Sequence, residues 1–146
     1  MLTVIVETAD AGDRLPALLA ALTSAAVEGL VREVLISGGG PPELLAVLRE
    51  ETGAELADDL AGALKAARSE RLLVLPAKIR LRPGWLTALA QHLQNGGLDA
   101  LILGEGGLFA GQTYGVLIAR AAAAGLVRPD LRRLRGKLGR RAARLK

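Results

Sequence analysis

The stretch from Arg71 to Leu86, RLLVLPAKIRLRPGWL, decides the fold. The apolar run from Leu72 to Leu75 indicates a buried strand, and a short basic turn follows it. Pro83 and Gly84 then favour the start of a helix. A strand, a loop and a helix in this order are typical of open α/β sheets, in which ligands bind at the carboxyl ends of the strands. The stretch therefore predicts both a fold class and the place of a binding site.

Strand and helix patterns alternate on both sides of this stretch. Short β-branched or apolar runs predict strands over residues 2–6, 31–36, 54–56, 98–103 and 114–118. Apolar residues three and four apart predict helices over residues 13–26, 44–53, 60–67, 83–94, 119–124 and 130–144. This alternation predicts a single α/β domain, a Rossmann-like fold with a mostly parallel sheet and helices on both faces.

Composition limits the function classes. The chain has 146 residues, of which 51% are hydrophobic, and its aromatic residues are Trp85, Phe109 and Tyr114. A chain of this length suits one domain with an aliphatic core. So few aromatic residues argue against a module that stacks nucleic-acid bases. The absence of cysteine excludes disulfides and thiolate chemistry.

The amino end lacks the pattern that is typical of a secretory signal. It reads MLTVIVETADAGD, without a basic region, and no apolar run in the chain reaches the roughly 18 residues that a membrane span needs. We therefore expect a soluble, cytoplasmic protein.

Positive charge gathers at the carboxyl end. Residues 128–146 hold nine Arg or Lys against one acid, a net charge of +8, while residues 1–127 hold ten bases and fourteen acids, a net charge of −4. We expect a main domain over residues 1–127 and a basic amphipathic helix over residues 128–146. Its apolar stripe could dock on its own domain or pair with a second copy as a homo-oligomer, and its basic face could meet a membrane surface or nucleic acid.

In its order of elements and in three motifs the chain resembles the family 2 glycosyltransferases. LTVIVETAD is similar to that family's first strand with its Pro-Thr-aromatic-Asn end, and VREVLISGGG is similar to its second strand. ARSERLLVLPAKIRLRPGWL resembles the strand that carries the Asp-x-Asp motif, with the helix start behind it. The resemblance covers residues 1–103 and implies a GT-A fold that binds a nucleotide sugar.

The chain departs from this family at the positions that hold its metal ion. The resemblance places Ser37 where the family has an aspartate that reads the nucleobase, and Pro76 and Lys78 where it has the two metal-binding aspartates. Two carboxylates hold Mg²⁺ or Mn²⁺ against the diphosphate, and neither a proline nor an ammonium can replace them as ligands. We therefore expect no metal and no other cofactor.

The candidate nucleotide-binding residues lie at the ends of three expected strands: Glu7, Thr8, Ser37, Gly38, Gly39, Ala77 and Lys78. Two interpretations stay open for Lys78, since its ammonium could replace the charge of the metal at a diphosphate, or it could belong to a solvated basic loop. The glycines could bring backbone amides to a phosphate or form a flexible turn.

Catalytic residues stay unassigned, because the family's carboxyl-terminal half, which supplies the base, is nearly absent. The pair Asp58 and Asp59 is explained by helix capping more simply than by catalysis. Two functions follow. One is a degenerate glycosyltransferase-like protein limited to metal-independent binding or transfer of a nucleotide sugar. The other is a non-catalytic pseudo-glycosyltransferase, a pseudoenzyme that serves as a binding or self-assembly module.

Overall fold

The computed structural model describes residues 2–8, 15–38, 43, 46–47, 49–50, 53–97, 99–105, 113–124, 126, 130–138 and 143–145. Within them, seven strands form one sheet in the order β3-β2-β1-β4-β6-β5-β7. The strands are β1 Leu2–Glu7, β2 Val31–Ser37, β3 Glu55–Ala57, β4 Arg71–Pro76, β5 Ala100–Leu103, β6 Tyr114–Ala119 and β7 Ala143–Leu145. Every neighbouring pair is parallel except the two that β6 makes, with β4 and with β5. Strand β6 therefore runs against the other strands.

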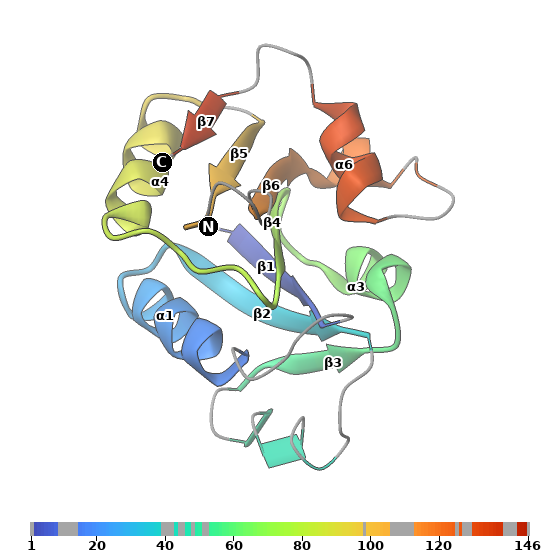
Figure 1. Cartoon of the computed structure of the whole chain (residues 1–146). Helices are drawn as coiled ribbons and strands as arrows, with labels where there is room; N and C mark the ends of the chain where they lie inside the picture. Colours follow the sequence, from blue (N-terminus) through green and yellow to red (C-terminus); the bar gives the residue numbers. More distant parts are fainter. Residues whose placement is uncertain are drawn as a thin grey trace.

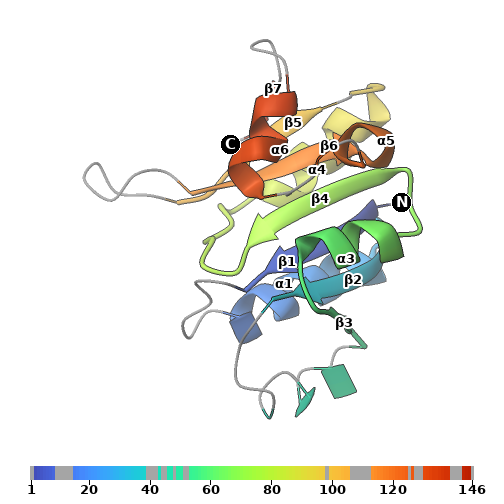
Figure 2. The ribbon, with the colours of Figure 1, turned by 90° about the vertical axis from the view of Figure 1, so that its right-hand side faces the viewer.

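Helices cover both faces of this sheet (Figure 1). The described helices are α1 Leu15–Val27, α3 Leu60–Ala66, α4 Trp85–Gln94, α5 Arg120–Ala123 and α6 Leu131–Lys137. Helices α1 and α4 lie on one face, while α3, α5 and α6 lie on the other, in front of the sheet in Figure 2. The predicted class, an α/β domain with a mostly parallel sheet covered on both faces, is confirmed.

Alternating side chains divide the core into two layers. In β1, Val4 and Val6 pack into the cluster that contains Leu19 and Leu22 of α1, while Ile5 packs into the cluster that contains Leu64 of α3. Successive residues of a strand face opposite sides of the sheet, so a strand covered by helices on both sides is apolar throughout. This explains why β1 and β4 appear in the sequence as nearly continuous apolar runs.

The carboxyl end corrects the sequence prediction. The helix expected over residues 130–144 spans only Leu131–Lys137, and Ala143–Leu145 form β7, which pairs in parallel with β5. Leu134 of α6 is fully buried on the domain's own sheet. The helical spacing of apolar residues therefore predicted the wrong structure beyond Lys137. The pairing of β7 with β5 supplies backbone hydrogen bonds that the local sequence pattern does not encode.

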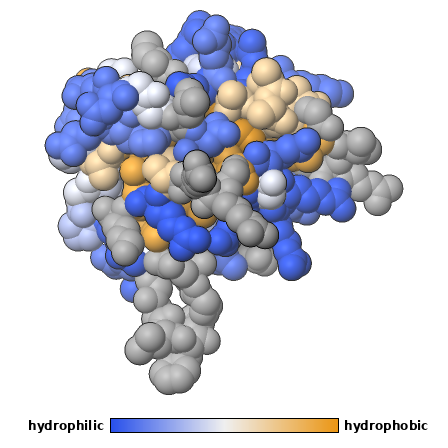
Figure 3. All heavy atoms as spheres, turned by 90° about the horizontal axis from the view of Figure 1, so that it is seen from above, coloured by the Kyte–Doolittle hydropathy of each residue, from blue (hydrophilic) through white to orange (hydrophobic). Residues whose placement is uncertain are grey.

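The described surface shown in Figure 3 is mostly hydrophilic, with apolar residues visible between the polar ones. Isolated apolar residues at a surface are normal in globular proteins. No helix in the described part of the chain has the length and apolar character required to cross a membrane.

Asp59, rather than Asp58, caps α3. Its Oδ1 accepts a 2.7 Å hydrogen bond from the backbone N–H of Gly62. We expect Asp59→Ala to lower the free energy of unfolding by about 1 kcal/mol, because the amide of Gly62 then loses its partner. Asp58→Ala is the matched control and should change it by less than about 0.5 kcal/mol. Urea unfolding followed by circular dichroism compares the two variants, and equal losses would contradict the capping role.

Candidate functional site

The carboxyl ends of β1, β2 and β4 meet at one edge of the sheet. Glu7, the last residue of β1, pairs with Ser37 of β2 on one side and with Pro76 of β4 on the other. Beyond the strand ends, the N–H of Ala77 donates to the carbonyl of Glu7 at 2.8 Å, and the N–H of Gly38 donates to the carbonyl of Ala57 at 3.3 Å. The candidate residues of three separate sequence stretches are thus brought together.

Two buried hydroxyl groups fix this edge. The backbone N–H and the hydroxyl of Thr8 both donate to the carbonyl of Ser37, at 3.0 and 2.8 Å. The Ser37 hydroxyl in turn makes a long, 3.5 Å bond to the carbonyl of Val6. Both side chains are almost completely buried, at 2% and 0% exposure. Their hydroxyl groups therefore hold β1 and β2 in register at the site.

The end of β4 turns sharply and presents a lysine. The N–H of Ile79 donates to the carbonyl of Pro76 at 3.0 Å, which closes a turn around Ala77 and Lys78. Ala77 and Ile79 are buried, whereas Lys78 between them is exposed. The buried neighbours fix the backbone that carries the lysine, so its Cα has a defined position at the strand end while the side chain reaches out of the core.

The basic loop after this turn is tied to the end of β5. Leu81 forms an isolated bridge with Gly104, and the N–H of Glu105 donates to the carbonyl of Arg80 at 2.7 Å. The guanidinium of Arg82 donates from Nε to the carbonyl of Gly104 at 3.2 Å. A Cβ at residue 104 would lie 2.5 Å from the Thr113 hydroxyl oxygen, so only glycine allows this close approach. The sequence indicated a glycine-rich segment here but not its contact with the basic loop.

A small cavity of about 230 Å³ opens beside this loop. Its lining includes Leu18 of α1, Arg80 and Trp85, the first residue of α4. Trp85 is half-buried and packs against the core cluster beneath α1 and α4. The carboxyl edge thus has an apolar wall next to its basic loop.

The end of β4 does not fit a divalent cation. The side chains of Pro76 and Ala77 offer no ligand atom, and Lys78 carries positive charge. Among the described residues there is no group of three His, Asp or Glu side chains that could hold a metal ion. Hard divalent cations need several oxygen ligands, commonly carboxylates. The side chains of Pro76, Ala77 and Lys78 supply no such ligand at the end of β4.

The glycine loop is described only in part. Gly38 has φ of +93°, in the left-handed region that favours glycine. Its backbone N–H already donates a hydrogen bond to the carbonyl of Ala57. Gly39, also a candidate nucleotide-binding residue, lies outside the described residues. Half of the helix expected over residues 44–53 also lies outside them, and within it residues 46–47 and 49–50 are helical.

Comparison with known proteins shows which solved structures have a similar fold. No family model matches the sequence, and no curated protein matches it. The structure is similar to glucosyl-3-phosphoglycerate synthase from Mycobacterium tuberculosis in complex with phosphoglyceric acid, with a TM-score of 0.62 and 14% identity. It is also similar to mannosyl-3-phosphoglycerate synthase from Rubrobacter xylanophilus, with a TM-score of 0.60 and 15% identity. A third similar structure is a 4-diphosphocytidyl-2C-methyl-D-erythritol synthase, with a TM-score of 0.68 and 11% identity.

The two groups of similar structures differ in length. The matches cover 86% and 84% of this chain but only 59% and 55% of the two sugar-transferring synthases. For the diphosphocytidyl synthase, the match covers 99% of this chain and 88% of the other. The chain has a GT-A-like fold, as its resemblance to family 2 glycosyltransferases implied, and it spans a little over half the length of the two synthases.

Proposed function

We propose that the chain binds a nucleoside diphosphate, free or as part of a nucleotide sugar, at the carboxyl edge of β1, β2 and β4, without a divalent cation. The observation that carries this proposal is the β4 turn, where exposed Lys78 occupies a defined position at the junction of three strand ends. In this fold class, ligands bind at that edge.

The local charge supports a diphosphate as the ligand. Lys78, Arg80 and Arg82 place three cationic groups within five residues after β4. Arg82 donates to the carbonyl of Gly104, and the Lys78 and Arg80 side chains are exposed to solvent. Ammonium and guanidinium groups both donate hydrogen bonds to phosphate oxygens, and such charge-assisted bonds are the stronger ones in proteins. The loop can therefore compensate the charge that a metal ion compensates elsewhere.

The similar structures support the same ligand class. One of them is glucosyl-3-phosphoglycerate synthase in complex with Mn²⁺, uridine diphosphate and glucosyl-3-phosphoglycerate, with a TM-score of 0.52 over 70% of this chain. In that protein a nucleoside diphosphate accompanies a metal ion. For this chain we propose the nucleotide without the ion, because the end of β4 offers an ammonium in place of carboxylates.

Binding is expected to be independent of divalent cations. A thermal-shift titration with uridine, guanosine, cytidine and thymidine diphosphates should show stabilisation by at least one of them, because a ligand that binds only the folded state raises the melting temperature. The stabilisation should persist when EDTA is added, since no cation contributes to the site. Loss of the shift in EDTA, with recovery on adding Mn²⁺, would contradict the proposal, as would no shift with any nucleotide.

Transfer of the sugar is a separate question from binding. If the chain is a metal-independent transferase, incubation with the sugar conjugate of the bound nucleotide should release the free diphosphate over time. If it is a non-catalytic binding module, the conjugate should bind and be recovered intact. We propose the binding function alone, because the described residues at the edge provide a charged anchor without an assigned catalytic base.

A further inference from the structure

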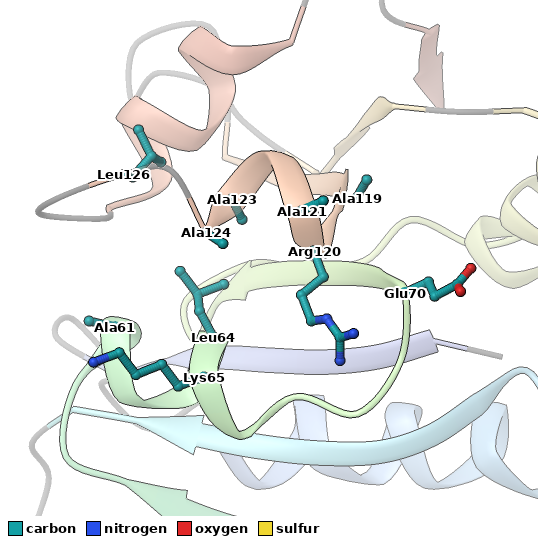
Figure 4. Close-up of a pocket in the computed structure, with 10 residues that line it drawn as sticks. All are labelled: Ala61, Leu64, Lys65, Glu70, Ala119, Arg120, Ala121, Ala123, Ala124 and Leu126. Atoms are coloured by element: carbon teal, nitrogen blue, oxygen red, sulfur yellow. The ribbon is translucent and has the colours of Figure 1, made fainter.

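A second cavity lies on the face of the sheet that α3 and α5 cover. It has a volume of about 750 Å³ and is bounded by α3, by the start of β4 and by α5, so we call it the α3–α5 cavity (Figure 4). Because β6 is antiparallel to β4, its last residue, Ala119, pairs with Arg71 at the start of β4. The end of the cavity at Glu70 and Arg120 lies beside the start of β4, roughly 17 Å from the carboxyl edge at about 3.3 Å per residue. The described lining shares no residue with the proposed nucleotide site.

The walls of the α3–α5 cavity are short and aliphatic. Leu64 of α3 points toward Ala123 and Ala124 at the end of α5, and Leu126 closes the same side (Figure 4). Leu64 and Ala123 are buried and belong to one core cluster, so this floor is part of the packed core. Among the described residues of the lining there is no aromatic side chain that could stack on a base. Volumes of this order are typical of small-molecule sites, and these walls suit an aliphatic chain.

A fixed arginine borders the floor. The backbone N–H of Arg120 donates to the carbonyl of Glu70 at 2.7 Å, and its Nη1 donates to the carbonyl of Ala67 at 3.0 Å. These two bonds attach both ends of the residue to the loop between α3 and β4. A guanidinium has five N–H donors, so it can bind a carboxylate while keeping the bond to Ala67. The arginine is therefore preorganised for an anion.

Charge around the α3–α5 cavity favours a single negative group. Lys65 and Arg120 supply two cations, and Glu70 supplies one carboxylate. Within the described part of the chain, no ion pair joins Glu70 to Arg120, and Figure 4 shows the Glu70 carboxylate directed away from the guanidinium. The Glu70 carboxylate therefore does not compete with a ligand for the Arg120 guanidinium. Together with the aliphatic floor, one preorganised cation selects a ligand with a charged head and an apolar body.

We propose that the α3–α5 cavity binds an aliphatic carboxylate, with its head group on Arg120 and its chain over Leu64, Ala123 and Ala124. The affinity is expected to rise by roughly fourfold for each methylene group buried on this floor. A neutral or cationic analogue of equal length should bind more weakly, because the guanidinium then stays without its anion or faces a like charge.

The test uses the full chain and a series of defined probes. Butanoate, hexanoate and octanoate are titrated while the methyl signals of leucine and alanine are followed by NMR, with octanol and octylammonium as analogues. We expect octanoate to shift the signals of Leu64, Ala123 and Ala124, with affinity falling along the shorter acids. Absence of any shift, shifts located elsewhere, or equal binding of octylammonium would overturn the proposal.

Variants separate the roles of charge and shape. Arg120→Gln should weaken octanoate binding by roughly 10-fold or more, whereas Arg68→Gln, at an exposed neighbour outside the lining, should not. Ala124→Trp should block binding by filling the space, and Ala122→Trp, on the same helix but outside the lining, should leave it unchanged. Ala124→Trp and Ala122→Trp leave Arg120 and its two bonds untouched, so this pair remains decisive if Arg120→Gln fails to fold. Equal binding by these two variants would place the ligand elsewhere.

Discussion

Replacing Lys78 by alanine is expected to weaken binding of the preferred nucleoside diphosphate by roughly 10- to 100-fold, the equivalent of one charge-assisted hydrogen bond. The lysine sits on the turn between Pro76 and Ile79, whose backbone is fixed by the bond between their N–H and carbonyl groups. Its side chain is exposed, so its removal leaves no cavity in the core. The loss should therefore appear in binding, measured by titration calorimetry, with the melting temperature of the free protein nearly unchanged.

Two further variants make this result specific. Lys78→Arg keeps the positive charge and should retain most of the affinity, because a guanidinium also donates to phosphate oxygens. Arg32→Ala removes an exposed cation near the amino end of β2, at the opposite edge of the sheet, and should leave the affinity unchanged. If Arg32→Ala weakens binding as much as Lys78→Ala does, the effect is one of overall charge. Unchanged affinity in Lys78→Ala would reject the proposed role of the lysine.

The dependence on salt gives an independent measure of the same contact. Screening weakens attraction between exposed charges, and the Debye length shortens from about 10 Å at 0.1 M salt to about 3 Å at 1 M. The affinity of the unmodified chain should thus fall with salt more steeply than that of Lys78→Ala. The difference between the two slopes reports the charge that Lys78 contributes at the site.

The sequence predicted every described strand except β7, because buried strands leave a clear local signal. The run at β4 and the helix after Gly84 appear where they were expected, and so does the cap at Asp59. The direction of a strand, in contrast, leaves no such local signal. The pattern of β6 predicts a strand but not its antiparallel orientation, because alternation within one strand is the same in both directions. That orientation places α5 beside the start of β4, so the α3–α5 cavity could not be predicted from sequence.

The candidate site shows the same division between local and tertiary information. The position of Lys78 just after a strand follows from the β4 stretch, and the rule that ligands bind at carboxyl strand ends makes it a candidate. The roles of Thr8 and Ser37 do not, because both hydroxyl groups bond to carbonyls of neighbouring strands. The contact of Arg82 with Gly104 likewise joins residues that only the folded sheet brings together. The sequence predicts the place and the charge of the candidate site, and the structure shows which contacts hold its backbone.

The largest effect on stability is expected for Leu73→Ala. Leu73 lies in β4 between Val4 of β1 and Leu117 of β6, and its side chain has 0% exposure. Removing a fully buried leucine side chain costs the transfer free energy of the lost methyl groups and that of the cavity left behind, about 3 kcal/mol in total. For a domain of this size, the melting temperature should fall by roughly 9 °C.

Leu56→Ala is the matched control, since it makes the same change in a strand of the same sheet. Leu56 lies in the three-residue strand β3 and is 42% exposed, so its replacement should cost about 1 kcal/mol or less. Both free energies of unfolding are measured by urea titration at equal protein concentration. If the two losses were equal, burial between β1 and β6 would not be the source of stability at Leu73. If Leu73→Ala loses more stability while the folded variant keeps its nucleotide affinity, the stability of the sheet and nucleotide binding at its carboxyl edge depend on different residues.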